Sequence, residues 1–372
     1  MNLNEARQRA QVALLDSGVE LRAGDPAACP LPPEVLVRLA PGSEGVQCVI
    51  GTGLTAEIFR LRHEGRDYAV KRARPEALVR NVDGRVSFLN ELQRRIELEA
   101  LREREGGLAG IVPTLFASLR LGLVVSPWID SRPEQAWDDR ALGQLFEAGG
   151  QLVREGFFEW DYCPGNLLDD GRQLWLFDFG YLYRFDPRTQ LNTAGNGQGC
   201  PQFHLAERFE TRNYFAFLLE LEQARGGPLA LAAFRREKEI ASECYTKLER
   251  DLAARGATPT VLAWLESINR HWRARLTDGL EALYWEEGWR SHRLDLDDDL
   301  HGESCTPMTL RRCDWMLAAL TNEFNSLLSS GALAHEPIEP TRERLLEHYR
   351  KLRGRAAVLQ MRPRAPDKNN CE

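Results

Sequence analysis

The sequence lacks any long apolar segment. No apolar run approaches the ~18 consecutive residues that a membrane-spanning helix requires. Residues 1–20 place charged side chains among short apolar stretches, which is not typical of a secretory signal peptide. We therefore expect no membrane span and a cytoplasmic location.

Paired cysteines and an excess of basic charge are also lacking. The eight cysteines are scattered and form no Cys-x-x-Cys pair, which gives little support to a zinc site or a redox motif. We expect free thiols in a reducing compartment. The net charge of −7 does not give the basic footprint that is usual in nucleic-acid-binding proteins, so no nucleic-acid partner is expected.

The chain has 372 residues, of which 43% are hydrophobic, and this is enough for two domains or for one two-lobed unit with an appendage. Its pattern divides it into four parts. Residues 1–45 predict a helix and then a Pro-rich extension, whose composition is more typical of an extended wrap or linker than of a core. Residues 46–127 predict a small β-rich lobe, residues 128–225 a second lobe, and residues 226–372 a helical extension with a disordered tail.

Individual elements follow from the hydrophobic periodicity and from the positions of glycine and proline. Strands are expected at 46–50, 58–62, 68–71, 110–115 and 118–125. Helices are expected at about 3–15, 86–104, 142–155, 206–225, 228–254, 259–287, 309–330 and 340–355. The acidic stretch 293–301 lacks the glycine and the glutamate that a calcium loop places at its sixth and twelfth positions, so it predicts a solvated loop.

Residues 157–180 carry the densest set of candidate functional side chains. Asp161 precedes Asn166 by five residues, and a predicted hairpin then leads to Asp178, which is followed by Phe and Gly. Mg²⁺ takes one or two carboxylates together with phosphate oxygens and water, so Asp178 and Asn166 make a chemically sufficient metal pair. Asp161 is then available as a base. Phosphoryl transfer from Mg-ATP requires such a set.

A Gly-rich turn and a lysine precede this stretch. Gly51 and Gly53 stand between two predicted strands, where their backbone N–H groups could approach phosphate oxygens. Ala56 stands where a third glycine is usual, and a strand rather than a helix follows, which argues against a Rossmann fingerprint. Lys71 ends the next predicted strand, and a lysine in that place can hold nucleotide phosphates.

The order of these features resembles the protein-kinase-like superfamily over residues 46–225: a Gly-rich hairpin, a strand lysine, a glutamate-bearing helix, a proline break, Asp-x-x-x-x-Asn and Asp-Phe-Gly. The segment from Asp161 to Asn166 is similar to the Asp-x-x-Pro-x-Asn loop of atypical and small-molecule kinases, such as the aminoglycoside phosphotransferase-like and RIO-like families. The resemblance implies an α+β, bilobal protein-kinase-like fold, with a small antiparallel β lobe, a helical lobe and an extra C-terminal helical region.

The resemblance also implies an ATP- and Mg²⁺-dependent kinase that transfers the γ-phosphate to a hydroxyl of a protein or of a small molecule. Asp161 would orient or deprotonate the acceptor hydroxyl, Asn166 would bind a second Mg²⁺, and Asp178 would bind the Mg²⁺ that bridges the phosphates. The expected nucleotide contacts are Gly51, Thr52, Gly53, Lys71, Ser126 and Trp128.

Three glutamates of the helix at 86–104 are candidates to pair with Lys71. Glu97 begins Glu-Leu-Glu-Ala-Leu, which resembles the Glu-x-x-x-Leu pattern of the superfamily, and it is our expected catalytic partner. Glu99 gives a more usual distance to the following strand, and Glu91 a more usual distance from Lys71.

The chain also departs from the usual pattern. Glu159 stands two residues before the expected base, where many of these families have histidine. No Ala-Pro-Glu triplet follows Asp-Phe-Gly, so ordinary peptide docking is not supported. Residues 201–212 occupy that region, and their Glu207, Arg208 and Arg212 could order the loop, recognise an anionic substrate or be ordinary charges at a helix start.

Two further functions stay open on the sequence. The chain could be a pseudokinase-like nucleotide-binding scaffold or a kinase-fold enzyme that transfers AMP. Alternatively, residues 226–372 could be the main functional part, with the kinase-like part as their regulator, although they carry no catalytic constellation. The identity of the acceptor cannot be read from the sequence.

Overall fold

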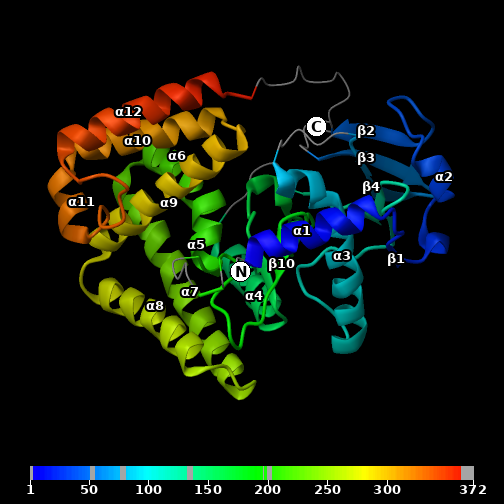
Figure 1. The fold of residues 1–372 in the computed structure, drawn as a ribbon, viewed down its shortest axis with the longest axis horizontal. Helices are drawn as coiled ribbons and strands as arrows, with labels where there is room; N and C mark the ends of the chain where they lie inside the picture. The colour runs from blue at the N-terminus through cyan, green and yellow to red at the C-terminus, as the bar shows by residue number, and fades with distance from the viewer. Residues whose placement is uncertain are drawn as a thin grey trace.

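The residues that the computed structural model describes are 3–50, 55–75, 81–131, 137–195, 197–198 and 203–361. They form an α+β protein, as the sequence predicts (Figure 1). An antiparallel sheet lies toward one end of the long axis, and most of the helices lie toward the other. None of the described helices is long and apolar enough to cross a membrane.

The strands of the sheet and the short strands beyond it alternate with helices only in the first half of the chain. The strands are β1 (Arg22–Gly24), β2 (Val46–Ile50), β3 (Ala56–His63), β4 (Arg66–Ala73), β5 (Phe116–Ser118), β6 (Leu123–Pro127), β7 (Phe157–Glu159), β8 (Leu167–Asp169), β9 (Leu174–Leu176) and β10 (Leu182–Arg184). The helices are α1 (Leu3–Asp16), α2 (Pro33–Leu36), α3 (Val82–Glu105), α4 (Asp139–Arg154), α5 (Leu205–Phe209), α6 (Phe215–Arg225), α7 (Gly227–Ala254), α8 (Pro259–Thr277), α9 (Leu280–Gly302), α10 (Pro307–Asn322), α11 (Phe324–Ser330) and α12 (Arg342–Val358).

The main sheet has the strand order β1-β5-β6-β4-β3-β2, and its neighbouring strands are antiparallel. Glu64 and Gly65 connect β3 to β4, and both have positive φ, as a tight two-residue hairpin turn requires. Side chains alternate between the two faces of the sheet. Val70 and Val125 pack with Leu36 of α2 on one face, while Val124 packs near α3 on the other.

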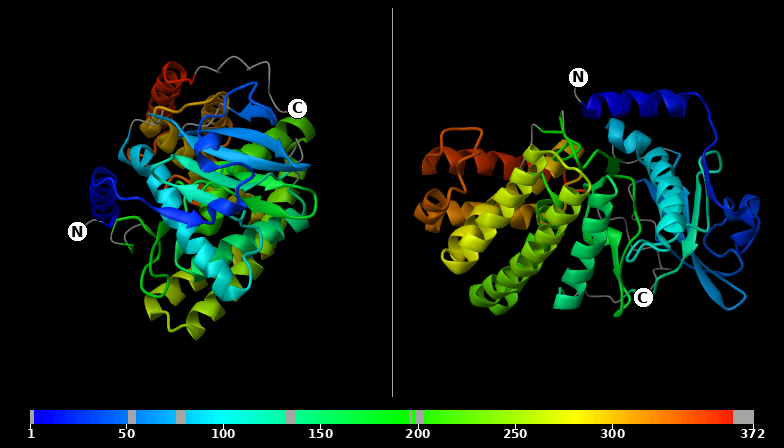
Figure 2. Two further views of the ribbon diagram at one scale, coloured as in Figure 1. Left: turned by 90° about the vertical axis from the view of Figure 1, so that its right-hand side faces the viewer. Right: turned by 90° about the horizontal axis from the view of Figure 1, so that it is seen from below.

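Helix α3 lies against the sheet, and α1 packs across α3 (Figure 2). The side chain of Asn81 caps the start of α3 by accepting a hydrogen bond from the Gly84 N–H, and α3 ends at Gly106, whose φ of 72° is left-handed. Gln11 of α1 donates a hydrogen bond of 2.9 Å from Nε2 to Oδ1 of the buried Asn90. Helix α1 therefore fixes the outer face of α3.

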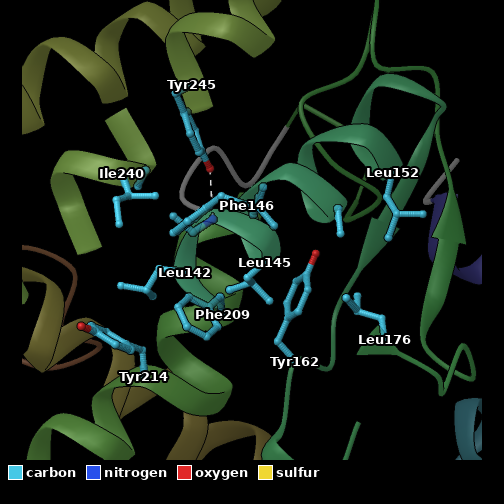
Figure 3. Close-up of a cluster of buried hydrophobic side chains, with 14 of the residues drawn as sticks. Leu142, Leu145, Phe146, Leu152, Tyr162, Leu176, Phe209, Tyr214, Ile240 and Tyr245 are labelled. Atoms are coloured by element: carbon cyan, nitrogen blue, oxygen red, sulfur yellow. Dashed lines mark hydrogen bonds between the residues drawn. The ribbon is translucent and has the colours of Figure 1, made fainter. Parts of the chain in front are cut away.

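Residues 157–184 rest on the helical part of the molecule. Strand β7 pairs with β10, and β8 pairs with β9, so two short ladders frame this segment. The ring of Tyr162 points into a buried cluster with Leu142 and Leu145 of α4 and Phe209 of α5 (Figure 3). Burial of Tyr162 anchors the turn that carries the expected catalytic residues.

The C-terminal helices have a core of their own. Buried side chains of α9, α10, α11 and α12 form a second cluster, in which the rings of Trp289 and Tyr349 lie edge to face with centroids 5.2 Å apart. In Figure 1 these helices lie beside α6 at the end of the molecule away from the sheet. The boundaries expected at 127/128 and 225/226 stay predictions.

Some expected elements are wrong. The segment 110–115 is not a strand, since Ile111 forms only an isolated bridge with Leu176. The extension 1–45 is not a linker, because it contributes β1 to the sheet and buries Leu36 against it. The helix expected at 259–287 divides at Gly279, whose φ of 111° does not allow a helix to continue.

The acidic stretch 293–301 is the clearest of these corrections. It belongs to α9 and is not a solvated loop. Asp295 and Asp299 lie one turn apart on the same face of α9, and both are buried. Arg212 lies within 4 Å of both carboxylates, and Arg312 pairs with Asp295.

Candidate active site

Lys71 lies at the centre of the candidate site. It is 6% exposed and stands on β4, where it pairs with Ile58 of β3 and Val124 of β6. Its Nζ lies 2.7 Å from Oε2 of Glu91 and 2.7 Å from Oδ2 of Asp178. Burial acts to lower the pKa of Lys71, but Asp178 and Glu91 outweigh it and hold that pKa above its ordinary value.

Glu91, and not Glu97, is therefore the partner of Lys71. Six residues correspond to about 240° around a helix, so Glu97 faces a different direction from Glu91. The Glu97 side chain is 37% exposed and pairs with Arg94, whose Nε lies 3.0 Å from Oε2 of Glu97. Glu99 accepts a hydrogen bond of 2.8 Å from the backbone N–H of Thr114.

Two further residues of α3 support the site, and the sequence analysis did not identify them. Arg95 donates to Oε1 of Glu91 from Nε at 3.0 Å and from Nη2 at 2.8 Å, and Nη2 also donates to the Phe177 carbonyl at 2.8 Å. Asn90 donates from Nδ2 to the carbonyl oxygens of Phe179, Gly180 and Leu182, at 3.0–3.2 Å. The four-residue spacing of Glu91 and Arg95, and an asparagine in the middle of a helix, are the signals that could have indicated them.

Asp178 is positioned from two sides. Lys71 holds its Oδ2, and its Oδ1 accepts a hydrogen bond of 3.1 Å from the Gly180 N–H. Burial acts to raise the pKa of Asp178, but the Lys71 charge and hydrogen bond outweigh burial and lower that pKa. Asp178 is therefore ionised at neutral pH, as a magnesium ligand must be.

Asp161 and Asn166 meet across a short 3₁₀ turn (Pro164–Asn166). Nδ2 of Asn166 donates to the backbone oxygen of Asp161 at 2.9 Å and to Oδ2 of its carboxylate at 3.2 Å. These bonds use the amide nitrogen and orient the side chain, whose Oδ1 is the atom suited to a metal ion.

Glu159 holds the start of this turn through a hydrogen bond to the backbone of Asp161. Its Oε1 accepts a hydrogen bond of 2.7 Å from the Asp161 N–H, and its Oε2 has no hydrogen-bond partner within the described part of the chain. Burial raises the pKa of Glu159 well above its ordinary value, and the nearby charges of Asp161 and Asp178 add to this effect. The raised pKa favours the protonated, uncharged form of Glu159 beside Asp161 and Asp178.

Arg212 connects the turn to the C-terminal helices. It lies in a π-helical turn (Glu210–Tyr214) between α5 and α6, a feature that is frequent at functional sites. Its Nε lies 3.2 Å from Oδ1 of Asp161, and its Nη1 lies 2.5 Å from Oδ1 of Asp295. The sequence left an anionic substrate open as the ligand of Arg212, and it gave no signal for Asp295 and Asp299 of α9 as its partners.

An apolar cavity of about 370 Å³ opens beside Lys71. Its volume lies within the range of about 300–1,000 Å³ that is usual for small-molecule sites. Its lining includes Ile58, Ala69, Val124, Leu168 and Phe177 as well as the expected contacts Lys71, Ser126 and Trp128. Ser126 is 6% exposed, and among the described residues its Oγ has no hydrogen-bond partner.

The expected phosphate contacts Gly51, Thr52 and Gly53 lie outside the described residues. Ile50, which directly precedes them, lines the cavity. Within the described ranges no group of three or more His, Cys, Asp or Glu side chains could hold a metal by itself. An ion held by Asp178 and Asn166 would need further ligands such as phosphate oxygens and water, which Mg²⁺ accepts.

Comparison with known proteins gives no family for this chain: no protein-family model matches it, and a search of curated protein sequences returns no match.

Proposed function

We propose that the protein is an ATP- and Mg²⁺-dependent phosphotransferase with a protein-kinase-like arrangement. The observation that carries this proposal is the contact of Lys71 with both Glu91 and Asp178 at the wall of an apolar cavity. The charges of Asp161 and Asp178 both raise the pKa of the buried Glu159, so the two carboxylates lie in one region. Lys71 lines the cavity, Asp178 contacts Lys71, and Asn166 contacts Asp161. A lysine, two carboxylates and an amide are the groups that phosphoryl transfer requires.

In this proposal the cavity takes the adenine base. Ala69, Val124 and Leu168 supply apolar contacts to the planar ring. The buried Oγ of Ser126 finds in the base the hydrogen-bond partner that it lacks among the described residues. Lys71 then contacts the α- and β-phosphates.

Asp178 and Asn166 would hold Mg²⁺ against the phosphates, and the ion would neutralise the charge that develops on the transferred group. The acceptor hydroxyl attacks the γ-phosphorus, its proton passes to the carboxylate of Asp161, and the bond between the γ-phosphorus and the bridging oxygen breaks to release ADP. Asn166 and Arg212 hold the two oxygens of Asp161 in place during this step. The acceptor is a hydroxyl of a protein or of a small molecule.

Release of ADP from Mg-ATP tests the proposal. The wild type is compared with Lys71→Met and Asp178→Ala, and both variants are expected to lose about 100-fold or more in kcat/KM because each removes a charge that acts on the phosphates. A shift in Tm on addition of Mg-ATP measures binding separately. Equal ADP release by all three proteins would contradict the proposal, and binding of Mg-ATP without any turnover would favour a nucleotide-binding scaffold instead.

A further inference from the structure

A second cavity, of about 700 Å³, lies against the Asp161 turn. Cys163 and Pro164 of that turn line it, together with residues of α6, α9 and α10. Arg212 lines it too and contacts Asp161 through Nε. This cavity therefore adjoins the turn that carries the proposed base.

The charged side chains of this second cavity already have partners. Oδ1 of Asp295 lies 2.5 Å from Nη1 of Arg212, and its Oδ2 lies 2.9 Å from Nε of Arg312. Asp299 accepts a hydrogen bond from Thr309 and lies 3.6 Å from Nη1 of Arg212. A charged ligand group would meet no unpaired opposite charge among these residues, and it would lose its hydration on entry.

Glu220, the remaining charged residue of the lining, is exposed and pairs with Arg311 at 2.9 Å. The other wall is apolar, with Trp137, Phe217 and Met308 facing the same space. Trp137 is 9% exposed and is held edge to face against Phe209, with ring centroids 4.7 Å apart. A rigid aromatic wall of this kind suits a compact apolar body.

Arg212 has one further donor group, Nη2, among the polar residues that line the second cavity. Arg212 uses Nε on Asp161 and Nη1 on Asp295, whereas no hydrogen bond of its Nη2 is seen within the described ranges. An Nη2 donor next to Asp161 can bind the oxygen of a hydroxyl group and place its proton toward the carboxylate.

We propose that this second cavity binds the phosphoryl acceptor and that the acceptor is a small, uncharged alcohol with an apolar body. The inference rests on the proposed function. The alcohol oxygen forms the new bond to the γ-phosphorus of ATP, its proton passes to Asp161, and ADP leaves. The C-terminal helices α9 and α10 thereby acquire a role, since they form one wall of the acceptor site and fix Arg212 through Asp295.

The test measures transfer of labelled γ-phosphate from Mg-ATP to three probes: phenethyl alcohol, which is uncharged, choline, which is cationic, and glycerol phosphate, which is anionic. We expect kcat/KM for phenethyl alcohol to exceed that for either charged alcohol by about tenfold or more. A higher kcat/KM for a charged probe, or transfer to none of them while ATP is hydrolysed, would overturn the acceptor class.

Ala216 of α6 lines the cavity, and Ala216→Trp fills part of it. We expect this variant to raise KM for phenethyl alcohol by about tenfold or more while KM for ATP changes by less than about twofold. Ala253→Trp makes the same change at an exposed position of α7 and should leave both KM values as in the wild type. If Ala216→Trp does not fold, Leu221→Trp, from the same lining, replaces it.

Equal KM values for phenethyl alcohol in the wild type and in the folded cavity variant would show that the second cavity does not bind the acceptor. Failure of the proposed function is distinguishable, because it would abolish ADP release altogether. In that case NMR measures the binding of phenethyl alcohol to the protein without nucleotide. Binding to the wild type that is lost in Ala216→Trp would support the second cavity as the binding site. Binding that is absent, or that is the same in both proteins, would contradict it.

Discussion

At the scale of single residues, the account depends on how Lys71 is held. Two carboxylates contact a lysine that is almost fully buried, and one of them, Glu91, is itself bound by Arg95. Buried charges are stable only when paired and hydrogen-bonded. The Lys71–Glu91 pair therefore fixes α3 against the sheet as well as placing Lys71 beside the cavity.

Glu91→Gln and Glu97→Gln make the same chemical change at two of the three positions that the sequence could not separate. We expect Glu91→Gln to lower kcat/KM for ATP by about 10–100-fold, because Lys71 and Arg95 both lose a charged partner. Glu97 is part-exposed and pairs with Arg94, so Glu97→Gln should change kcat/KM by less than about twofold. Steady-state ADP release with each variant measures this, and similar losses in both would refute the assignment.

Asp161, Asn166, Asp178 and Lys71 could be selected from the sequence because their order and spacing are local features. The choice among Glu91, Glu97 and Glu99 could not be made in this way. It depends on the rotation of α3 against the sheet, which is fixed by tertiary packing of residues such as Leu92. The sequence left several roles open for Arg212, since its partner Asp295 lies 83 residues away in sequence.

At the scale of elements, α9 shows how tertiary contacts override local propensity. Four aspartates within residues 295–299 favour a loop, because aspartate is a weak helix former. In the structure the helix continues, and its buried face pairs Asp295 with Arg212 and Arg312. Sequence periodicity predicted α7 closely, with 228–254 expected and Gly227–Ala254 observed, because its apolar face needs no distant partner to be recognised.

A buried charged cluster joins α7 to the π-helical turn and to α9. Lys238 is fully buried and pairs with Glu210 and Glu287, and it lies 3.6 Å from Oε2 of Glu237. Within the described part of the chain, both carboxylate oxygens of Glu237 lack a hydrogen bond. Burial raises the pKa of Glu237 from 4.5 to about 7, although Lys238 opposes this shift.

Glu237→Gln should therefore stabilise the protein at alkaline pH. The folded state holds a proton that the unfolded chain releases, so the stability contributed by protonated Glu237 is full below pH 4.5 and is lost as the pH rises to about 7. We expect the variant to raise Tm by about 3–6 °C at about pH 8 and by less than about 1 °C at about pH 4.5. Thermal unfolding at both pH values measures this.

Glu243→Gln, at an exposed position of α7, is the matched control for that change. It should leave Tm unchanged at both pH values. A Glu237→Gln variant with the same pH dependence of Tm as the wild type would show that Glu237 is ionised in the folded protein.

At the scale of the whole molecule, the α+β class and the order of most elements could be predicted from the sequence. The contribution of β1 to the sheet could not, because three residues give no periodic signal and their pairing with β5 joins segments far apart in sequence. The contact of α9 with Arg212 was also unpredictable, and through Arg212 it connects residues beyond 226 to Asp161.

The central claim is that γ-phosphoryl transfer occurs at the site formed by Lys71, Asp161, Asn166 and Asp178. Phosphorus NMR of Mg-ATP incubated with the protein and phenethyl alcohol tests it most directly, because it identifies the bond that breaks. We expect ADP together with a phosphate monoester, and loss of both products in Asp178→Ala. Formation of AMP and pyrophosphate, or ATP that stays intact, would contradict it.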